Sequence, residues 1–401
     1  MAGATLTTLS NLLKDFYLPP VVEQLNNEVL LLQRLESRSQ ELFGNQAVVP
    51  LHKGRSGGVG ARAEGGQLPS PGNQSYAKAV YDLKYLYGRV RVTGPSMAKT
   101  ASEAGSFLQA LKGELDGIRA DLRKDVARQV YGAGDSKLAT VVSNAAGVIT
   151  ISSREPIDKG QIYVGQLLDV GTVAAPTLKS ASTSVTAVTA ATPSVTVDNA
   201  AISTAGTDFL FRAGSAGVSV SYEAMGLQGL VASTPTNTIG GINRNSAGNE
   251  YWKNLVINQA GVLALDTMQQ AVNRVNIAGG NTSGIITSFG VQRAYFNLLQ
   301  SQVRYTSPQT IKGGFQVLDF SGKPIIADLD APWGSMYFLQ EEFIKVFSNR
   351  DWHFLDEDGD VLKWRSDYDE WEAVLARYMN LGITRGNTNL VVYGITDTVG
   401  Y

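Results

Sequence analysis

The sequence predicts an α+β protein in which a long helix lies over an antiparallel sheet and a small β-barrel or sandwich is inserted into the chain. Residues 103–131 carry apolar side chains at steps of three and four, the spacing of one helical face. Residues 315–396 are mainly strand-like runs with many aromatic side chains. Residues 135–217 form a charge-poor island of Ala, Ser, Thr, Val and Gly with repeated short β-prone runs.

The composition excludes several classes of chemistry. The chain has 401 residues and a formal net charge of −2, which gives no sign of binding to nucleic acid or to an acidic membrane. The absence of cysteine excludes disulfides, thiolate metal sites and thiol catalysis. The two histidines, His52 and His353, cannot build a multi-histidine metal site. No secretory signal or membrane-spanning run is visible, so we expect a soluble chain made in the cytoplasm.

The first 95 residues are expected to extend away from the core. Residues 1–46 predict a helical arm, with two short helices broken at Pro19-Pro20 and an apolar stripe that must lie on another surface. Residues 47–95 predict an extended hairpin, because strand-like runs at 47–51 and 77–92 flank a long polar tip rich in Gly, Ser and Pro. Loops of this length inside compact domains are uncommon and usually functional.

The hairpin tip contains a misleading pattern. Residues 58–63, Gly-Val-Gly-Ala-Arg-Ala, fit the glycine pattern of dinucleotide-binding loops. That pattern requires a strand before it and a helix after it. Here the strand before it contains Pro50, and Gly65-Gly66 and Pro69 break any helix that could follow. We therefore expect no cofactor at this position.

Glu103 to Tyr131 predicts the long helix, of roughly 40 Å at 1.5 Å per residue. Ser102 is a suitable N-cap, and Gly132 and Gly134 supply a stop. Gly113 and Gly117 each cost about 1 kcal/mol relative to Ala inside a helix, which predicts that another backbone passes close to them. The residues expected to pack this helix are Leu111, Gly113, Leu115, Gly117, Ile118 and Leu122.

The rest of the chain divides into three predicted parts. The short β-prone runs of residues 135–220 predict a small barrel or sandwich. Residues 221–335 alternate helix and strand and predict an α/β layer, with Ser321-Gly322 as a hairpin turn. Four long strands are expected beneath the long helix, at 336–347, 351–368, 371–384 and 389–396.

The sequence offers no catalytic, cofactor-binding or metal-binding constellation. The acidic run Asp356 to Asp360 resembles part of a calcium loop but lacks the spacing to a terminal Glu, and a solvated hairpin tip is the expected structure. His353 beside Trp352 is expected to be a packed or surface residue. Asp367, Asp369 and Glu370 have no acid placed opposite them by any pattern in the sequence.

The order of predicted elements resembles the major capsid proteins of tailed bacteriophages with the HK97 fold. Residues 49–66 look like the start of that family's extended loop, and Val90-Arg91-Val92-Thr93 looks like the strand that leads into its spine helix. Residues 130–134, resumed at 226–230, are similar to the glycine-rich junction after the spine. The run from Gly313-Gly314 to Pro324-Ile325-Ile326 looks like the return from the axial domain.

The resemblance implies a division of the chain and a structural role. It implies an N-terminal arm (1–46), an extended loop (47–95), a peripheral domain with the spine helix (96–134 and 336–401), an insertion domain (135–220) and an axial domain (221–335). It implies hexamers and pentamers of an icosahedral phage head around double-stranded DNA, located in the virion and made in the host cytoplasm. The candidate inter-subunit contact residues are Arg55, Arg62, Glu64 and Lys78.

Partners and alternatives follow from the same resemblance. The chain opens with the arm and has no coiled-coil pre-sequence, which implies either a separate scaffolding protein or none; a portal and a decoration protein are further expected partners. DNA is enclosed without sequence-specific binding, and no cofactor or membrane is expected. Lys53, Lys78 and Lys84 match no crosslinking motif. Two alternatives stay open: an encapsulin-type compartment shell, and a carbohydrate-active enzyme with an accessory β domain.

Overall fold

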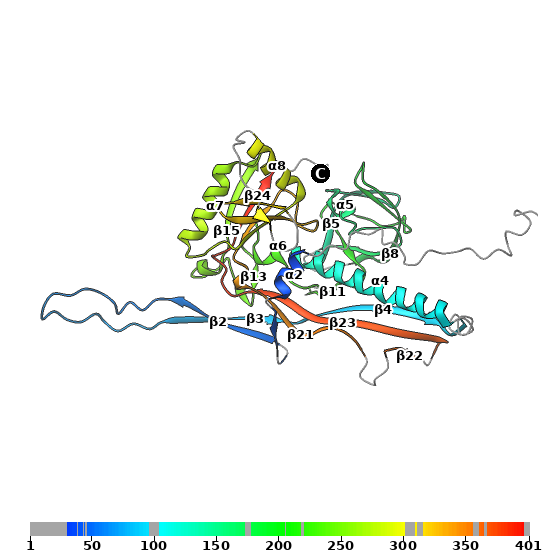
Figure 1. The fold of residues 1–401 in the computed structure, drawn as a ribbon, viewed down its shortest axis with the longest axis horizontal. Helices are drawn as coiled ribbons and strands as arrows, with labels where there is room; N and C mark the ends of the chain where they lie inside the picture. The colour runs from blue at the N-terminus through cyan, green and yellow to red at the C-terminus, as the bar shows by residue number, and fades with distance from the viewer. Residues whose placement is uncertain are drawn as a thin grey trace, which may run out of the picture.

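The computed structural model gives an elongated molecule in which a body carries two projections, a hairpin and a barrel (Figure 1). It describes residues 30–37, 39–42, 44, 46–95, 104–172, 178–204, 206–217, 220–300, 309–310, 316–355, 361–364 and 367–396. Most of the predicted arm, with its break at Pro19-Pro20, lies outside the described residues, and so does the acidic run 356–360.

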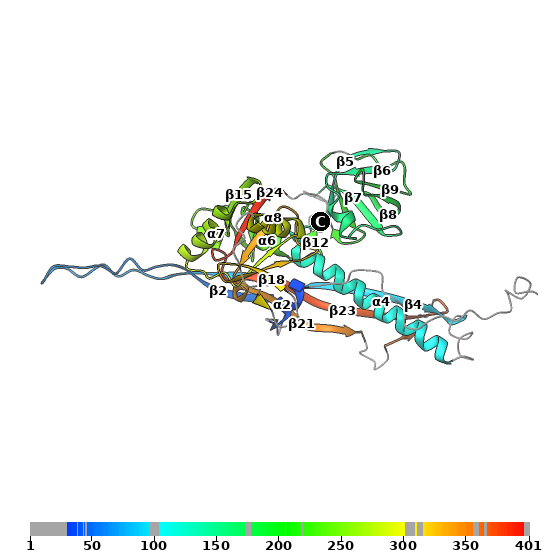
Figure 2. The same ribbon diagram turned by 45° about the horizontal axis from the view of Figure 1, so that its top comes forward.

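One half of the body is a long helix on an antiparallel sheet. Helix α4 (Ala104–Tyr131) runs along strand β4 in both views (Figures 1 and 2). The five-stranded sheet has the order β1-β21-β23-β22, and β4 pairs with β23. Its strands are β1 (Gln40–Glu41), β4 (Lys84–Thr93), β21 (Ile344–Phe354), β22 (Lys363–Trp364) and β23 (Glu370–Ile383). Burial alternates along β4, so Leu86 and Val90 are buried while Tyr85 and Tyr87 are exposed.

The close approach between helix and sheet is made by a glycine of the sheet. A Cβ at Gly88 on β4 would lie 2.9 Å from Ile118 Cγ1, so the absence of a side chain there lets the helix lie against the strand. The expectation for the helix is wrong at Gly117, because nothing described lies within 4 Å of a Cβ built there. Leu122 is buried, while Leu115 and Ile118 are half-buried. Leu111 and Gly113 are part of α4, but their side chains lie outside the described residues.

The hairpin is a two-stranded ribbon that extends far beyond the body (Figure 1). Strands β2 (Gln46–Gly54) and β3 (Ser75–Asp82) pair antiparallel from Gln46↔Asp82 to Gly54↔Ser75. The predicted single strand over 77–92 is wrong. The run forms two strands that separate at Leu83, because β3 pairs with β2 while β4 pairs with β23.

The other half of the body is a mixed seven-stranded sheet with the order β15-β24-β20-β16-β19-β18-β17. Its strands are β15 (Leu255–Gly261), β16 (Gly284–Thr287), β17 (Gln309–Thr310), β18 (Gln316–Phe320), β19 (Lys323–Ala327), β20 (Met336–Leu339) and β24 (Leu390–Ile395). Helices α7 (Leu265–Ile277) and α8 (Phe289–Gln300) contribute to its core. The turn predicted at Ser321-Gly322 is confirmed, with φ of 52° and 72° and the pair Phe320↔Lys323 on either side.

Two strands expected beneath the long helix belong to this second sheet instead. Strands β20 and β24 pair with each other, and β20 also pairs with β16. All four residues of β20 are buried, as expected for a strand covered on both faces. The predicted strand 336–347 is interrupted by the 3₁₀ helix η2 (Glu341–Phe343), after which β21 enters the five-stranded sheet.

The third part is a closed six-stranded barrel with the order β10-β5-β6-β9-β8-β7. Its elements are β5 (Lys137–Ala145), β6 (Val148–Ile151), α5 (Glu155–Asp158), β7 (Leu167–Gly171), β8 (Leu178–Thr189), β9 (Ser194–Val197) and β10 (Phe209–Arg212). Its interior is aliphatic, with Val141, Ile149, Leu168, Val170 and Leu210 fully buried. Of the two architectures that the sequence left open, this is the barrel.

Short elements connect these parts. They are α2 (Leu30–Glu36), β11 (Ala216–Gly217), β12 (Val220–Ser221), α6 (Leu227–Leu230), β13 (Thr238–Ile239), β14 (Ile242–Asn243) and η1 (Glu250–Trp252). The chain enters and leaves the barrel at one place, where Ser136 Oγ lies 2.6 Å from Ser221 Oγ. A Cβ at Gly226 would lie 2.2 Å from Gln129 O and 2.6 Å from Gly132 O, so only glycine fits where the chain returns to the end of α4.

Candidate functional site

The hairpin projects into solvent and carries all four predicted contact residues. Arg55, Glu64 and Lys78 are exposed and form no ion pair within the described part of the chain. Arg62 instead organises the tip, because its guanidinium donates to Ala61 O at 2.9 Å and to Gln67 O at 3.1 Å. The structure does not bring these four residues together.

Apolar side chains on the hairpin are also left in solvent. Val59 is 88% exposed, Leu68 81% and Tyr76 69%. A ribbon this thin cannot bury them within the chain. Single exposed apolar side chains are common on protein surfaces, so these three add to the exposed surface of the hairpin without defining a binding patch.

The glycine pattern in the tip is not a phosphate-binding loop. Residues 58–63 belong to no helix or strand, and a turn rather than a helix follows them at 64–65. A Cβ at Gly58 would lie 3.2 Å from the backbone of Ser70 and Gly72. Glycine at position 58 is therefore explained by how closely the two sides of the hairpin tip pass each other.

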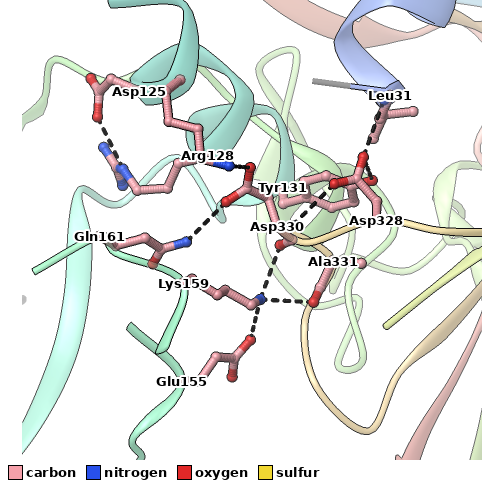
Figure 3. A network of polar contacts seen from close by, with 11 residues as sticks. Leu31, Asp125, Arg128, Tyr131, Glu155, Lys159, Gln161, Asp328, Asp330 and Ala331 are labelled. Carbon is pink, nitrogen blue, oxygen red and sulfur yellow. Dashed lines mark hydrogen bonds and ion pairs between the residues drawn. The ribbon is translucent and has the colours of Figure 1, made fainter. Parts of the chain in front are cut away.

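A second candidate is a buried polar junction around residues 328–333, the loop after β19 (Figure 3). The Asp328 Oδ2 atom accepts from Leu31 N of α2 at 3.2 Å and from the Tyr131 hydroxyl of α4 at 2.8 Å. The Asp330 carboxylate, whose side chain is fully buried, accepts from Lys124 Nζ of α4 at 2.8 Å. One loop thus binds both the first described helix and the long helix.

The same loop holds the barrel. Lys159, just after α5, is 5% exposed and donates to Ala331 O at 2.7 Å and to Asp330 O at 3.2 Å. Its charge is balanced by Glu155 at 2.6 Å, which also accepts from Trp333 N at 3.0 Å. Because a buried cation must be paired and hydrogen-bonded, these contacts fix the barrel against the body.

A second set of charges joins the barrel to the end of the long helix. Arg128 pairs with Glu223 at 2.5 Å and with Asp125 at 3.1 Å, and Arg212 at the end of β10 reaches Asp125 at 2.8 Å. Burial alone would raise the pKa of Asp125, but the two guanidiniums outweigh burial and lower it. Burial raises the pKa of Glu223, and Arg128 offsets this only in part.

Beside this set lies a hollow of about 540 Å³, lined by residues 132–137 and by Trp333, Tyr337 and Tyr393. Its charged side chains are already paired: Arg128 with Glu223 at 2.5 Å, and Lys137 with Asp135 at 2.8 Å. This lining does not favour acid–base catalysis, which needs an acid or base free to meet a substrate.

The buried junction escaped the sequence reading. Asp328, Asp330, Glu155 and Lys159 match no motif, and their partners come from distant parts of the chain. One signal was present. Glu155, Asp158 and Lys159 are charges within an otherwise charge-poor island, and a charge kept there is usually paired.

His353, which the sequence predicts to be a packed or surface residue, is held by contacts with its neighbours. His353 Nδ1 lies 2.8 Å from the Asp351 carbonyl oxygen, and its ring meets Tyr378 edge-on. Within the described ranges, no group of three or more His, Cys, Asp or Glu side chains could hold a metal ion. No described helix is both long and apolar enough to cross a membrane.

Comparison with known proteins identifies the fold. The capsid asymmetric unit of cyanophage A-1(L) matches with a TM-score of 0.64 at 14% identity, covering 98% of this chain and 100% of that one. The capsid of a native GTA particle matches with a TM-score of 0.56 at 9% identity, covering 99% and 100%. The holo-SrpI encapsulin complex from Synechococcus elongatus matches with a TM-score of 0.53 at 9% identity, covering 100% and 99%. No protein-family model and no curated protein matches the chain.

These matches define first a class of fold, the one shared by the capsid and encapsulin structures just named. At such identities the likeness carries the fold alone, and it extends over almost the whole length of both chains. Within that class, the fold is that of a phage capsid protein, as the resemblance to the HK97-fold major capsid proteins implied.

Proposed function

We propose that this chain is the major capsid protein of a tailed bacteriophage and self-assembles into an icosahedral head around double-stranded DNA. The observation that carries the proposal is the hairpin. It extends well beyond its own body with exposed charged and apolar side chains, and it belongs to a chain with a capsid-protein fold. A second copy is the partner that such a projection fits, because shells repeat one contact many times.

The proposed division of labour follows the parts of the structure. The arm (1–46) and the extended loop (47–95) would lie over neighbouring copies. The axial domain (221–335), together with β20 and β24, would meet its copies around the five-fold and six-fold axes. Residues 96–134 and the remainder of 336–401 would form the peripheral domain, and the barrel (135–220) would be an insertion domain.

The mechanism is cumulative binding, without catalysis by this chain. Each contact between copies is modest, and closure of the shell adds many of them. Arg55, Glu64 and Lys78 are proposed to form ion pairs with a neighbour, while Arg62 keeps the tip in shape. The net charge of −2 suits a container that neither retains DNA strongly nor repels it. A scaffolding protein, a portal and a decoration protein are the proposed partners.

Removing the hairpin tip tests the proposal. The β2–β3 ladder ends at Gly54↔Ser75, so residues 56–71 can be replaced by an Asn-Gly turn without shortening the ribbon's paired part. Co-expressed with the phage's scaffolding protein, the unaltered chain should give closed particles in electron micrographs. The shortened chain should remain folded and soluble but give none. Normal particles from the shortened chain would remove the hairpin from the mechanism.

The second candidate function is an encapsulin-type compartment that encloses a cargo protein. The match to the holo-SrpI encapsulin complex favours it. The two functions differ in particle behaviour: a compartment should form alone, at one small size, and co-purify with a protein. A phage head should need a scaffold and take up DNA. The carbohydrate-active alternative finds no support in the hollow beside Arg128, whose charged lining is internally paired.

A further inference from the structure

One side chain holds a central position where the hairpin joins the body. Tyr81, near the end of β3, is buried, and its hydroxyl donates to Ile383 O at 2.7 Å. The same hydroxyl accepts from Ile383 N at 3.1 Å. The phenol therefore satisfies both backbone groups of the last residue of β23, a position where the ladder would otherwise end with unpaired groups.

The ring of Tyr81 lies in a socket made by the absence of side chains. It stacks on Phe347 at 5.4 Å between ring centroids. A Cβ at Gly382 would lie 2.6 Å from the Phe347 ring and 2.9 Å from the Tyr81 ring. A Cβ at Gly240 would lie 2.7 Å from Ala79 Cβ and 3.3 Å from the Tyr81 ring. Glycine is thus required on both sides of the tyrosine.

Two further contacts complete the root. Val80 N donates to Gly240 O at 2.9 Å, and Asn380 Nδ2 donates to Asp82 O at 2.6 Å. Behind them, the buried Arg244 donates to Leu230 O at 2.6 Å and to Asn254 Oδ1 at 3.1 Å, which ties down the loop that carries Gly240. Beyond the root, β2 and β3 pair only with each other among the described strands.

We propose that Tyr81 is a positioning residue that sets the direction in which the hairpin leaves the body, and through it the angle between neighbouring copies in the shell. The second half of this statement rests on the proposed function; the first half does not. A long ribbon amplifies a small rotation at its root, so a loosened Tyr81 would spread the position of the tip widely.

The chain contains no cysteine, which allows the direction to be measured. Spin labels on cysteines at Ser70 in the tip and Gln270 on α7, both exposed, report their separation in the unassembled chain by electron–electron double resonance. Tyr81→Phe keeps the ring and removes the hydroxyl. It should broaden the distance distribution, whereas Tyr76→Phe, on the same strand and 69% exposed, should leave it unchanged. Equal distributions for Tyr81→Phe and the unaltered chain would overturn the proposal.

A second measurement does not involve the altered bonds. The Val80 amide is held by Gly240 O, and losing the two hydrogen bonds of the Tyr81 hydroxyl should raise the hydrogen-exchange rate of that amide about tenfold or more. If Tyr81→Phe does not fold, Gly382→Ala provides a second test. The added methyl group would displace the Tyr81 and Phe347 rings and should shift the mean distance between the two spin labels. An unshifted mean in a folded Gly382→Ala chain would also count against the socket.

Particle imaging separates the two halves of the proposal. A broadened distribution together with particles of altered size or irregular shape supports both. A broadened distribution with particles of unchanged size overturns the link to the angle between copies. If the unaltered chain forms no shells, the proposed function fails while the spin-label result still decides the role of Tyr81.

Discussion

The barrel and the hairpin both project from the same body, but they are held in opposite ways. The barrel is joined through buried charges, with Lys159, Glu155 and Arg212 meeting the 328–333 loop and α4. The hairpin is joined through the Tyr81 hydroxyl, the backbone hydrogen bond from Val80 N to Gly240 O and the bond from Asn380 Nδ2 to Asp82 O. Two glycines make room for the Tyr81 ring. The hydrogen bonds of Lys159 and Glu155 to the loop and the Arg212–Asp125 ion pair hold the barrel at more than one point, whereas the contacts of the hairpin with the body gather at its root. The barrel is therefore fixed to the body, whereas the direction of the hairpin depends on the contacts at its root.

The largest effect is expected where the barrel meets the body. Lys159→Met keeps the length of the side chain but leaves two buried carbonyl oxygens and Glu155 without their cation. Chemical unfolding of the unassembled chain should show a loss of about 3 kcal/mol. The control is Lys137→Met, whose pair with Asp135 is about one-third exposed and should matter little. Equal losses for the two variants would show that the buried Lys159 contacts hold the barrel no more firmly than an exposed ion pair does, which removes the barrel's side of the comparison.

An intermediate effect is expected in the body that carries both projections. Gly88→Ala puts a methyl group 2.9 Å from Ile118 Cγ1 and should cost about 1–3 kcal/mol, since the packed helix cannot move away freely. Gly117→Ala, next to Ile118 on α4, meets nothing described within 4 Å and should stabilise the helix by about 1 kcal/mol. Thermal unfolding of the two single variants measures both. A stabilising Gly88→Ala would show that helix and sheet are loosely packed.

The smallest effect is expected from pH at the Asp328 carboxyl. Burial raises the pKa of Asp328, and its hydrogen bonds from Tyr131 and Leu31 N offset this only in part. The folded chain then holds a proton that the unfolded chain has released, so this group's contribution to stability falls as pH rises above its ordinary pKa of 3.8. Asp328→Asn should therefore gain stability relative to the unaltered chain between pH 4 and pH 7, as measured by urea unfolding. A relative loss over that range would show that the ionised form is the favoured one.

Prediction from sequence succeeded where local pattern decides the structure. The stripe of residues 103–131 defines α4, and Ser321-Gly322 defines its hairpin. Prediction from sequence failed where the structure depends on which strand pairs with which. Nothing local in 336–347 or 389–396 tells which sheet they join, and β20 and β24 entered the seven-stranded one. The prediction that Gly117 allows the close approach of another backbone is likewise wrong. The glycine that lets α4 lie close to the sheet is Gly88, in strand β4.

The candidate sites divide along the same line. The exposed hairpin was predictable, since a long polar tip between two strand runs has few other structures. The junction around Asp328 and Asp330 was not, because each of its contacts joins residues far apart in the sequence. The Tyr81 socket was equally hidden: a tyrosine in a strand and a glycine 301 positions later acquire meaning only when the fold brings them together.

The contact between Ser136 and Ser221 bears on how the chain folds. The excursion between them spans 85 positions, and closing a loop of that length costs about 4 kcal/mol of chain entropy. The barrel's strands pair only among themselves, so the barrel can form as a local nucleus. Once it has formed, the end of α4 and Gly226 are already neighbours, and the body assembles as though the intervening segment were a short turn. The connectivity therefore allows the barrel to fold first. Its folding reduces the chain entropy that the body must lose when its own segments come together.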